Sequence, residues 1–285
     1  MPTLRALTAK DHNRDGAGFT YVYPVYSRRA QGLSIGINLN PNNACNWRCI
    51  YCQVPNLVRG SAPEINLSLL EKELRALIGE VSQPAFLQEK LPAGAQRIND
   101  IAISGNGEPT SAKEFADVVN LIAKVMADSQ LLGKIKLVLI TNGSLVHRAA
   151  VKKGLQRMAE INGEVWFKLD SATAAGMRQI NNSALSVERV YSNLRTVTAL
   201  CPTWLQTCLF EIEGALPSEE ERAAYLSFVD RALSEKIALK GVHIYGLARP
   251  SLQPEAAVLR AAPSSWLSEF AQAIEARGLP VTVSD

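Results

Sequence analysis

The feature that most constrains the fold of this chain is a regular alternation of short apolar runs with longer amphipathic segments. Apolar runs rich in β-branched residues predict strands, and segments with apolar residues three or four positions apart predict helices. Strands are predicted at residues 32–39, 100–104, 135–140, 164–169, 205–212, 242–246 and 281–284. Helices are predicted at residues 68–79, 113–127, 145–159, 186–199, 218–234 and 264–276. Residues 19–26 predict an N-terminal hairpin or edge strand, and residues 81–96 a surface loop.

Six βα repeats in this order predict an α/β fold. Parallel strands joined by right-handed helical crossovers form either an open doubly wound sheet or a barrel. In both architectures the ligand site lies at the C-terminal ends of the strands. Five polar motifs follow predicted strands, namely CNWRCIYC, SGNGEPT, TNGS, KLDS and YGLARP. We therefore expect these motifs to contribute to one site.

The composition sets broad limits on compartment and partners. With 285 residues and 47% hydrophobic content the chain can bury a full core, and one domain is the expectation. No apolar run approaches the length of a membrane span, and the start lacks the apolar stretch of a signal peptide, so we expect a cytoplasmic protein without a membrane partner. The net charge of +3 is too small to argue for nucleic acid. Residues 1–60 nevertheless hold seven Lys or Arg against two acids, which indicates either a scattered solvated surface or an anion-binding face.

Three of the five cysteines, Cys45, Cys49 and Cys52, lie within eight residues in the spacing C-x3-C-x2-C. This spacing favours metal ligation in a reducing compartment over a disulfide framework. A structural zinc site would need a fourth protein ligand, and none lies nearby in the sequence, so zinc is the weaker alternative. If a four-iron cluster forms on three thiolates, its fourth iron is open to a small molecule. The other two cysteines, Cys201 and Cys208, are predicted to be buried small hydrophobic residues.

The motif SGNGEPT follows a predicted strand and contains two glycines on either side of one asparagine. Without Cβ atoms, Gly105 and Gly107 allow the backbone to approach a ligand closely, although glycine and Asn106 also form ordinary turns. Glu108 is a candidate partner for a ligand ammonium group, or it is a carboxylate held by backbone donors.

The next two motifs also admit two interpretations. In TNGS, Asn142 either lies at the mouth of the ligand site or is an ordinary turn residue, and Ser144 is predicted to cap the following helix. Lys168 and Asp170 are two residues apart in a strand and share a face, so they form either a structural ion pair or contacts to a ligand.

Four residues on or after the last two core strands are candidates for catalysis: Glu211, His243, Tyr245 and Arg249. His243 and Tyr245 share one strand face, so both would point into a barrel if one forms. A lone histidine is more often a hydrogen-bonded core residue than a catalyst. Arg249 is a candidate for binding a substrate anion, because its planar guanidinium suits carboxylate or phosphate.

The cysteine spacing, the aromatic Tyr51 before the last cysteine and the position of the loop after a first core strand resemble the radical S-adenosylmethionine (radical SAM) superfamily. The resemblance extends over roughly residues 33–250, through all five motifs. It implies a single domain with an α/β fold, a partial (β/α)6 TIM-type barrel of parallel strands over residues 32–250. An N-terminal extension (1–31) and a C-terminal helix and strand (251–285) would flank the core.

The resemblance further implies a [4Fe-4S] cluster on the three cysteines, with S-adenosylmethionine on the open iron. Reductive cleavage would give a 5′-deoxyadenosyl radical that takes a hydrogen atom from the substrate, and a reductant such as flavodoxin or ferredoxin would be a partner. In the superfamily the residue matching Tyr51 lies near the adenine, and the glycine motif holds the methionyl amino group. The implied cofactor-binding residues are Tyr51, Gly105, Asn106, Gly107, Glu108, Asn142, Lys168 and Asp170.

The substrate is not identified by these motifs. They look most like the wyosine-forming branch, but those enzymes carry further cysteines before the radical loop, and this sequence has none before Cys45. The leading hypothesis is a radical SAM enzyme that acts on a small molecule, a nucleoside or RNA. The alternatives are radical modification of a peptide or partner protein, and a non-catalytic iron–sulfur or zinc binding module.

Overall fold

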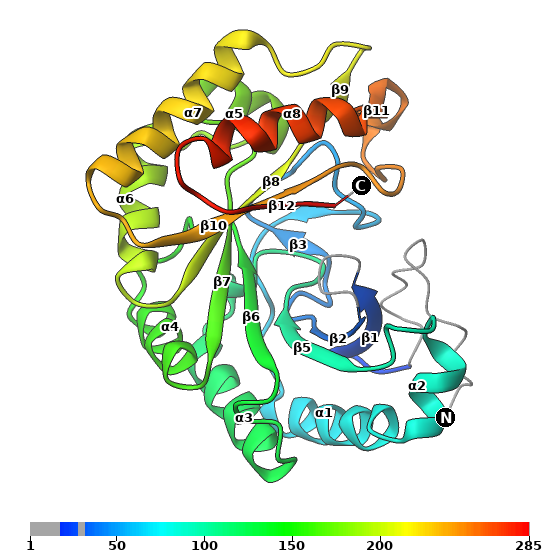
Figure 1. The fold of residues 1–285 in the computed structure, drawn as a ribbon. Coiled ribbons are helices and arrows are strands. Elements are labelled where there is room, and N and C mark those ends of the chain that lie inside the picture. Colours follow the sequence, from blue (N-terminus) through cyan, green and yellow to red (C-terminus); the bar gives the residue numbers. More distant parts are fainter. Residues whose placement is uncertain (1–17, 28–31, 285) are drawn as a thin grey trace.

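The computed structural model describes residues 18–27 and 32–284. Its main element is one eight-stranded sheet with the order β1-β2-β5-β6-β7-β8-β10-β12 (Figure 1). The strands are β1 (Val22–Ser27), β2 (Gly32–Ile37), β5 (Ile98–Ile103), β6 (Lys136–Thr141), β7 (Gly163–Lys168), β8 (Thr203–Cys208), β10 (Leu239–Tyr245) and β12 (Val281–Ser284). The edge strand β1 is antiparallel to β2, and the other neighbours are parallel.

Eight helices connect or follow these strands and lie on the outer side of the curved sheet (Figure 1). They are α1 (Leu67–Val81), α2 (Pro84–Lys90), α3 (Phe115–Asp128), α4 (Ala149–Glu160), α5 (Ala174–Asn181), α6 (Val187–Thr198), α7 (Glu219–Ser234) and α8 (Ser264–Glu275). From β2 onward each strand is added at the same edge in chain order. A doubly wound sheet reverses its order at a switch point, so this winding gives a partial TIM-type barrel. Of the two architectures that the βα repeats allow, this is the one that the family resemblance implies.

Alternating side chains give the sheet an apolar outer face and a more polar inner face. In β2, Leu33, Ile35 and Ile37 are fully buried in the core shared with the helices. Ser34, between them, faces inward and donates a short hydrogen bond to Asp100 of β5. The helices carry the matching apolar stripes, and several have side-chain caps such as Ser186 at the start of α6. The lumen of the half-barrel is therefore available for polar ligands.

The predicted elements agree with the structure except at a few places. The predicted strand 205–212 is split, because β9 (Phe210–Ile212) leaves the main sheet and pairs with β11 (Leu259–Ala261). The predicted loop 81–96 contains α2, and the short helix α5 was not predicted. Of the N-terminal extension, residues 1–17 and 28–31 lie outside the described residues, while β1 forms the predicted hairpin with β2.

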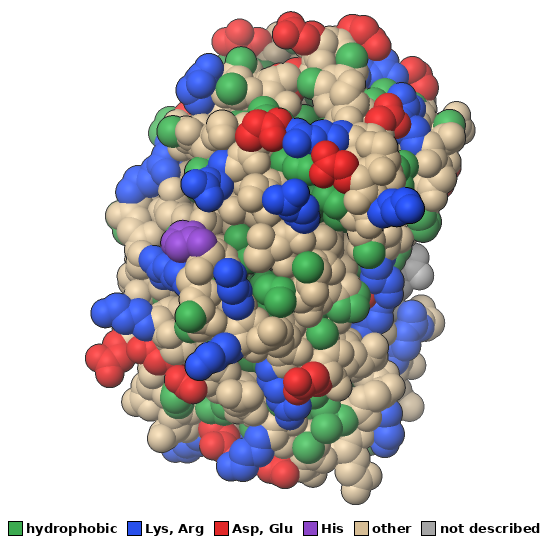
Figure 2. All heavy atoms as spheres, turned by 90° about the vertical axis from the view of Figure 1, so that its left-hand side faces the viewer, with side chains coloured by type: hydrophobic (Ala, Val, Ile, Leu, Met, Phe, Trp, Pro, Cys, Tyr) green, Lys and Arg blue, Asp and Glu red, His purple; other side chains and the backbone are tan. Residues whose placement is uncertain are grey.

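The surface shows no large field of one charge on the face drawn in Figure 2, where Lys and Arg are interspersed with Asp and Glu. Ion pairs such as Arg231 with Glu188 and Arg157 with Glu160 join opposite charges on the outer helices. Positive and negative side chains are therefore mixed over these outer helices. Among the described residues, none of the helices has the length and apolarity needed to cross a membrane.

Candidate active site

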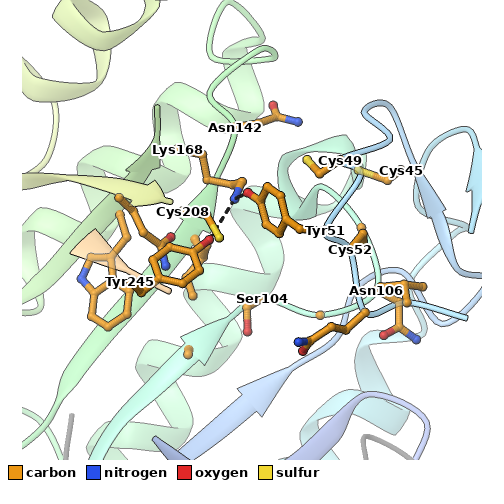
Figure 3. A pocket seen from close by; sticks show the side chains of 18 of the residues that line it. Cys45, Cys49, Tyr51, Cys52, Ser104, Asn106, Asn142, Lys168, Cys208 and Tyr245 are labelled. Atoms are coloured by element: carbon orange, nitrogen blue, oxygen red, sulfur yellow. Dashed lines mark hydrogen bonds between the residues drawn. The ribbon is translucent and has the colours of Figure 1, made fainter. Parts of the chain in front are cut away.

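A cavity of about 290 Å³ opens at the C-terminal ends of the parallel strands (Figure 3). Residues from the cysteine loop, the glycine motif, the TNGS and KLDS motifs and the segment after β10 all line it. The cavity continues into the lumen as far as Ser34 and Asp100. The sequence prediction that the motifs contribute to one site therefore agrees with this arrangement.

The three cysteines of the loop line one end of the cavity as free thiols (Figure 3). Cys45 ends the short strand β3 (Ala44–Cys45), which pairs with β4 (Val58–Arg59). Burial raises the pKa of the Cys45 thiol to about 11 and that of Cys49 to about 12, so a metal must displace their protons to bind. Within residues 18–27 and 32–284, no three His, Cys, Asp or Glu side chains are close enough to hold a single metal ion. Three thiols around one cavity do suit a larger cluster held by thiolates.

Asparagines after β2 join the cysteine loop to the glycine motif. Asn38 Oδ1 accepts hydrogen bonds from the backbone N–H of Asn40 at 3.1 Å and of Asn106 at 3.0 Å. Asn40 Nδ2 donates to the carbonyl oxygen of Ala44 at 2.9 Å, and Asn106 Nδ2 donates to Asn43 Oδ1 at 2.7 Å. The two motifs are thus held as one unit although about 60 residues separate them.

The two glycines of the motif are required by close packing of the chain against itself. A Cβ atom on Gly105, whose φ is 145°, would lie 2.4 Å from Asn38 Oδ1. A Cβ atom on Gly107 would lie 2.1 Å from the carbonyl oxygen of Ala44. Both glycines line the cavity. Their missing side chains therefore make room for the cysteine loop, while their backbones face the ligand space.

Glu108 is buried and connects the glycine motif to the end of β6. Its Oε1 accepts from Thr110 N at 3.1 Å, from Thr110 Oγ1 at 2.5 Å and from Thr141 Oγ1 at 2.6 Å. Its Oε2 accepts from Asn142 N at 2.7 Å. Burial raises the pKa of Glu108, although these hydrogen bonds act in the opposite direction. In the structure Glu108 is thus a carboxylate held by protein donors.

Asn142 lies at the cavity wall and contacts the cysteine loop. Its Nδ2 donates to Asn46 Oδ1 at 2.9 Å, and Asn46 Nδ2 donates to Ser144 Oγ at 2.7 Å. Ser144 Oγ also donates to Asn142 Oδ1 at 2.7 Å. The prediction that Ser144 caps a helix is wrong, because α4 begins only at Ala149 and Ser144 instead bonds across to the loop.

Lys168 and Asp170 form a buried ion pair, with Nζ and Oδ2 3.6 Å apart. Tyr51 bridges them, since its hydroxyl donates to Asp170 Oδ2 at 2.6 Å and accepts a short hydrogen bond from Lys168 (Figure 3). Lys168 Nζ also donates to Tyr245 Oη at 3.3 Å. Burial raises the pKa of Tyr51 well above its ordinary value, and the charge of Asp170 raises it further. Tyr51 therefore stays a neutral donor at the base of the cysteine loop.

The catalytic candidates are separated by the structure. Tyr245 and Arg249 line the cavity. Glu211 lies on β9, opposite Arg260 of β11, and does not line this cavity. The break between β8 and β9 takes it out of the main sheet.

His243 belongs to an aromatic layer within the half-barrel. Its ring stacks on Trp204, with centroids 4.4 Å apart, and contacts Trp166 at 4.7 Å. Its Nδ1 is hydrogen-bonded to Thr282 Oγ1. His243 points inward, as the strand pattern predicts, but it is not among the residues that line the cavity.

Sequence reasoning missed Gln206, which lies on the inner face of β8 and lines the cavity. The residue is 2% exposed, and its Oε1 has no hydrogen-bond partner among the described residues. Native structures rarely leave such a group unpaired, so an incoming ligand donor is a natural partner. A polar residue in an apolar strand, two positions before Cys208, was the available signal.

The model of the radical SAM superfamily matches residues 39–214, more than half of the chain. The chain belongs to this superfamily. The matched stretch of this radical SAM protein contains the cysteine loop, the glycine motif and the strands β5 to β8.

The chain is also similar to other proteins in sequence and in fold. A UPF0026 protein of Synechocystis sp. is 28% identical over 186 residues, which cover 62% of this chain and 59% of that protein. The structure of TYW1 with a lysine-pyruvate adduct bound matches with a TM-score of 0.56 at 13% identity, over 95% of this chain and 79% of that one. A radical SAM methyltransferase from Sphaerobacter thermophilus matches with a TM-score of 0.59 at 11% identity, over 92% and 68%. At these identities the two structures show a shared fold.

Proposed function

We propose that this radical SAM protein binds a [4Fe-4S] cluster on Cys45, Cys49 and Cys52 and abstracts hydrogen from a substrate held in the half-barrel. When bound, the cluster and S-adenosylmethionine supply the reductive cleavage that yields a 5′-deoxyadenosyl radical. The observation that carries the proposal is that three thiols, the glycine motif and the ends of the central strands line one cavity. An external one-electron reductant, such as a flavodoxin or ferredoxin, belongs to the proposal.

The residues of the chain would divide the work of binding S-adenosylmethionine. The backbone of residues 105–107 faces the cavity and offers polar groups to the methionyl amino and carboxylate ends. Asn142 adds a side-chain amide at the same wall, and Lys168 adds a positive charge beside Tyr51. Asp170 fixes the orientation of both Tyr51 and Lys168. Glu108 also lines the cavity, and its carboxylate holds the backbone N–H of Asn142.

The substrate would occupy the inner part of the cavity. Trp166 lines the cavity there, and Gln206 offers to an N–H or O–H group a carbonyl oxygen that has no partner within residues 18–27 and 32–284. Tyr245 and Arg249 also line the cavity. These groups support a polar substrate, that is, a small molecule, a nucleoside or an accessible RNA base.

The test is anaerobic reconstitution with iron and sulfide, followed by reduction with dithionite in the presence of S-adenosylmethionine. We expect iron–sulfur absorbance and formation of 5′-deoxyadenosine, measured by liquid chromatography. Cys49→Ala should lose both, because the cluster would lack a ligand. Cys201→Ala is the matched control and should keep both, because Cys201 is buried outside this cavity, with its thiol near the carbonyl oxygen of Gly163.

A wild-type protein that retains zinc, takes up no iron and does not cleave S-adenosylmethionine would overturn the proposal. Retained turnover in Cys49→Ala would also overturn it, since the assigned ligand would then be dispensable.

A further inference from the structure

The C-terminal end of helix α5 is hydrogen-bonded to the backbone of the cysteine loop. Arg48 N donates to the carbonyl oxygen of Asn181 at 3.1 Å, and Ile50 N donates to that of Ile180 at 2.8 Å. Asn182, left-handed with φ of 50°, ends the helix and donates from Nδ2 to the carbonyl oxygen of Arg48 at 2.8 Å. The last carbonyl groups of a helix lack partners within it, and here the loop supplies them. The loop around Cys49 is thereby fixed against α5.

The side chain of Asn181 continues this contact to a sulfur atom. Asn181 is 1% exposed, and its Nδ2 donates to Cys49 Sγ at 3.2 Å and to Asp170 Oδ2 at 2.7 Å. A carboxylate only accepts, so Asp170 determines which end of the amide faces the site. Asp170 is held in turn by Cys208 N at 3.0 Å and by Tyr51. One N–H of Asn181 is therefore anchored, and the other is aimed at the sulfur.

A hydrogen bond to a ligand sulfur changes the redox balance of a cluster. The reduced cluster carries one more negative charge than the oxidised cluster, and an N–H donor stabilises that charge. The bond also lies in a buried setting, where such interactions are weakly screened.

We propose that Asn181 is a positioning residue that raises the reduction potential of the cluster by donating a hydrogen bond to Cys49 Sγ. The inference rests on the proposed function, because it needs the cluster. It goes further by assigning a redox role to a residue outside every motif found in the sequence.

The test compares Asn181→Leu with wild type in a reductive titration followed by electron paramagnetic resonance. Leu keeps a similar size and removes the donor, so the cluster should become harder to reduce. We expect about a tenfold change in the reduction equilibrium, which equals about 59 mV for one electron. Asn181→Ser, which shortens the side chain, should shift the reduction potential in the same direction.

Asn182→Gly is the matched control. Glycine keeps the left-handed backbone and removes a side chain that holds the loop without touching sulfur. It should leave the potential unchanged while the cluster loses iron faster to a chelator.

Two outcomes would overturn the inference. One is an unchanged potential in an Asn181→Leu protein that keeps its cluster and still cleaves S-adenosylmethionine; the proposed function would then stand. The other is loss of the cluster in both Asn181 variants, which would make the residue purely structural. Failure of the wild type to form a cluster would instead count against the proposed function.

Discussion

The carboxylate of Glu108 accepts four hydrogen bonds from three residues, and it does so in a fully buried position. Burial penalises its charge and the donors favour it, and burial prevails because the pKa is raised. Glu108 is a candidate ligand contact by its place in the sequence, and in the structure its carboxylate also joins the glycine motif to the end of β6. Gly107 likewise has a structural role, because a Cβ atom at this position would collide with the carbonyl oxygen of Ala44.

The raised pKa of Glu108 predicts a pH-dependent contribution to stability. The contribution is complete below pH 4.5, the ordinary pKa, because both states are then protonated. As the pH rises towards the folded pKa, the folded state holds more protons than the unfolded state, so stability falls. In Glu108→Gln this dependence is absent. The difference in unfolding free energy, wild type minus variant, should therefore shrink as the pH rises, and urea unfolding at a series of pH values measures it. A difference that grows with pH would contradict the prediction.

Among the elements, the segment after β10 provides a second set of contacts to the cysteine loop, in addition to those of α5. Ser251 Oγ donates to the carbonyl oxygen of Ile50 at 2.7 Å, and Gln253 Nε2 donates to those of Cys52 and Val54 at 3.2 and 3.0 Å. The following short helix η2 (Pro254–Val258) adds an ion pair in which Arg48 meets both oxygens of Glu255, at 2.9 and 2.6 Å. These contacts hold in place the carbonyl groups of Ile50, Cys52 and Val54 in and just after the cysteine loop.

We predict that Gln253→Ala loosens the cluster without unfolding the protein. The change removes a buried donor from two carbonyl groups, and each lost hydrogen bond contributes about 1 kcal/mol. The release of iron to a chelator, measured by the loss of cluster absorbance, should be several-fold faster than in the wild type. The exposed Gln272→Ala is the control and should release iron at the wild-type rate. Equal rates in both variants would show that the segment does not stabilise the loop.

How far the elements and the site follow from sequence depends on the range of the interactions. The cysteine loop, the glycine motif and the barrel strands are set by local spacing and periodicity, so they were predictable. Helix α5 was missed because it spans only eight residues. Its contact with the loop was also hidden, because Asn181 and Cys49 are 132 residues apart and share no local pattern. The strand 205–212 looked continuous because Leu209 is apolar. In the structure the contact with β10 ends at Leu209, and residues 210–212 pair with β11 instead.

At the scale of the whole molecule, the half-barrel places segments that are far apart in the sequence around one cavity. The structure also has a second cavity. The second, of about 330 Å³, lies among α5, α7, α8 and residues 208–218. Cys208 lines both cavities. Asp170, which forms the ion pair with Lys168, lines the second cavity. The two cavities therefore share Cys208 in their common wall.

Hydrogen exchange over the whole chain can locate the ligand. Addition of S-adenosylmethionine to the reconstituted protein should slow exchange in residues 45–52, 104–108 and 141–144, because a bound ligand limits local opening. Residues 212–218, at the second cavity, should be unaffected. After removal of the cluster with a chelator, the ligand should have little effect anywhere. Protection centred on residues 212–218 would place the ligand in the second cavity instead.

The wide separation of the loop from its supports has a consequence for how the protein is made. The chain leaves the ribosome from its N-terminus, so all three thiols emerge long before Asn181, and Gln253 follows Cys52 by 201 residues. For most of translation the thiols lack the contacts that bury and orient them. They are then open to oxidants and to competing metals in the cell. Under the proposed function, iron and sulfide are therefore best delivered after translation, when the complete chain has folded around the cysteine loop.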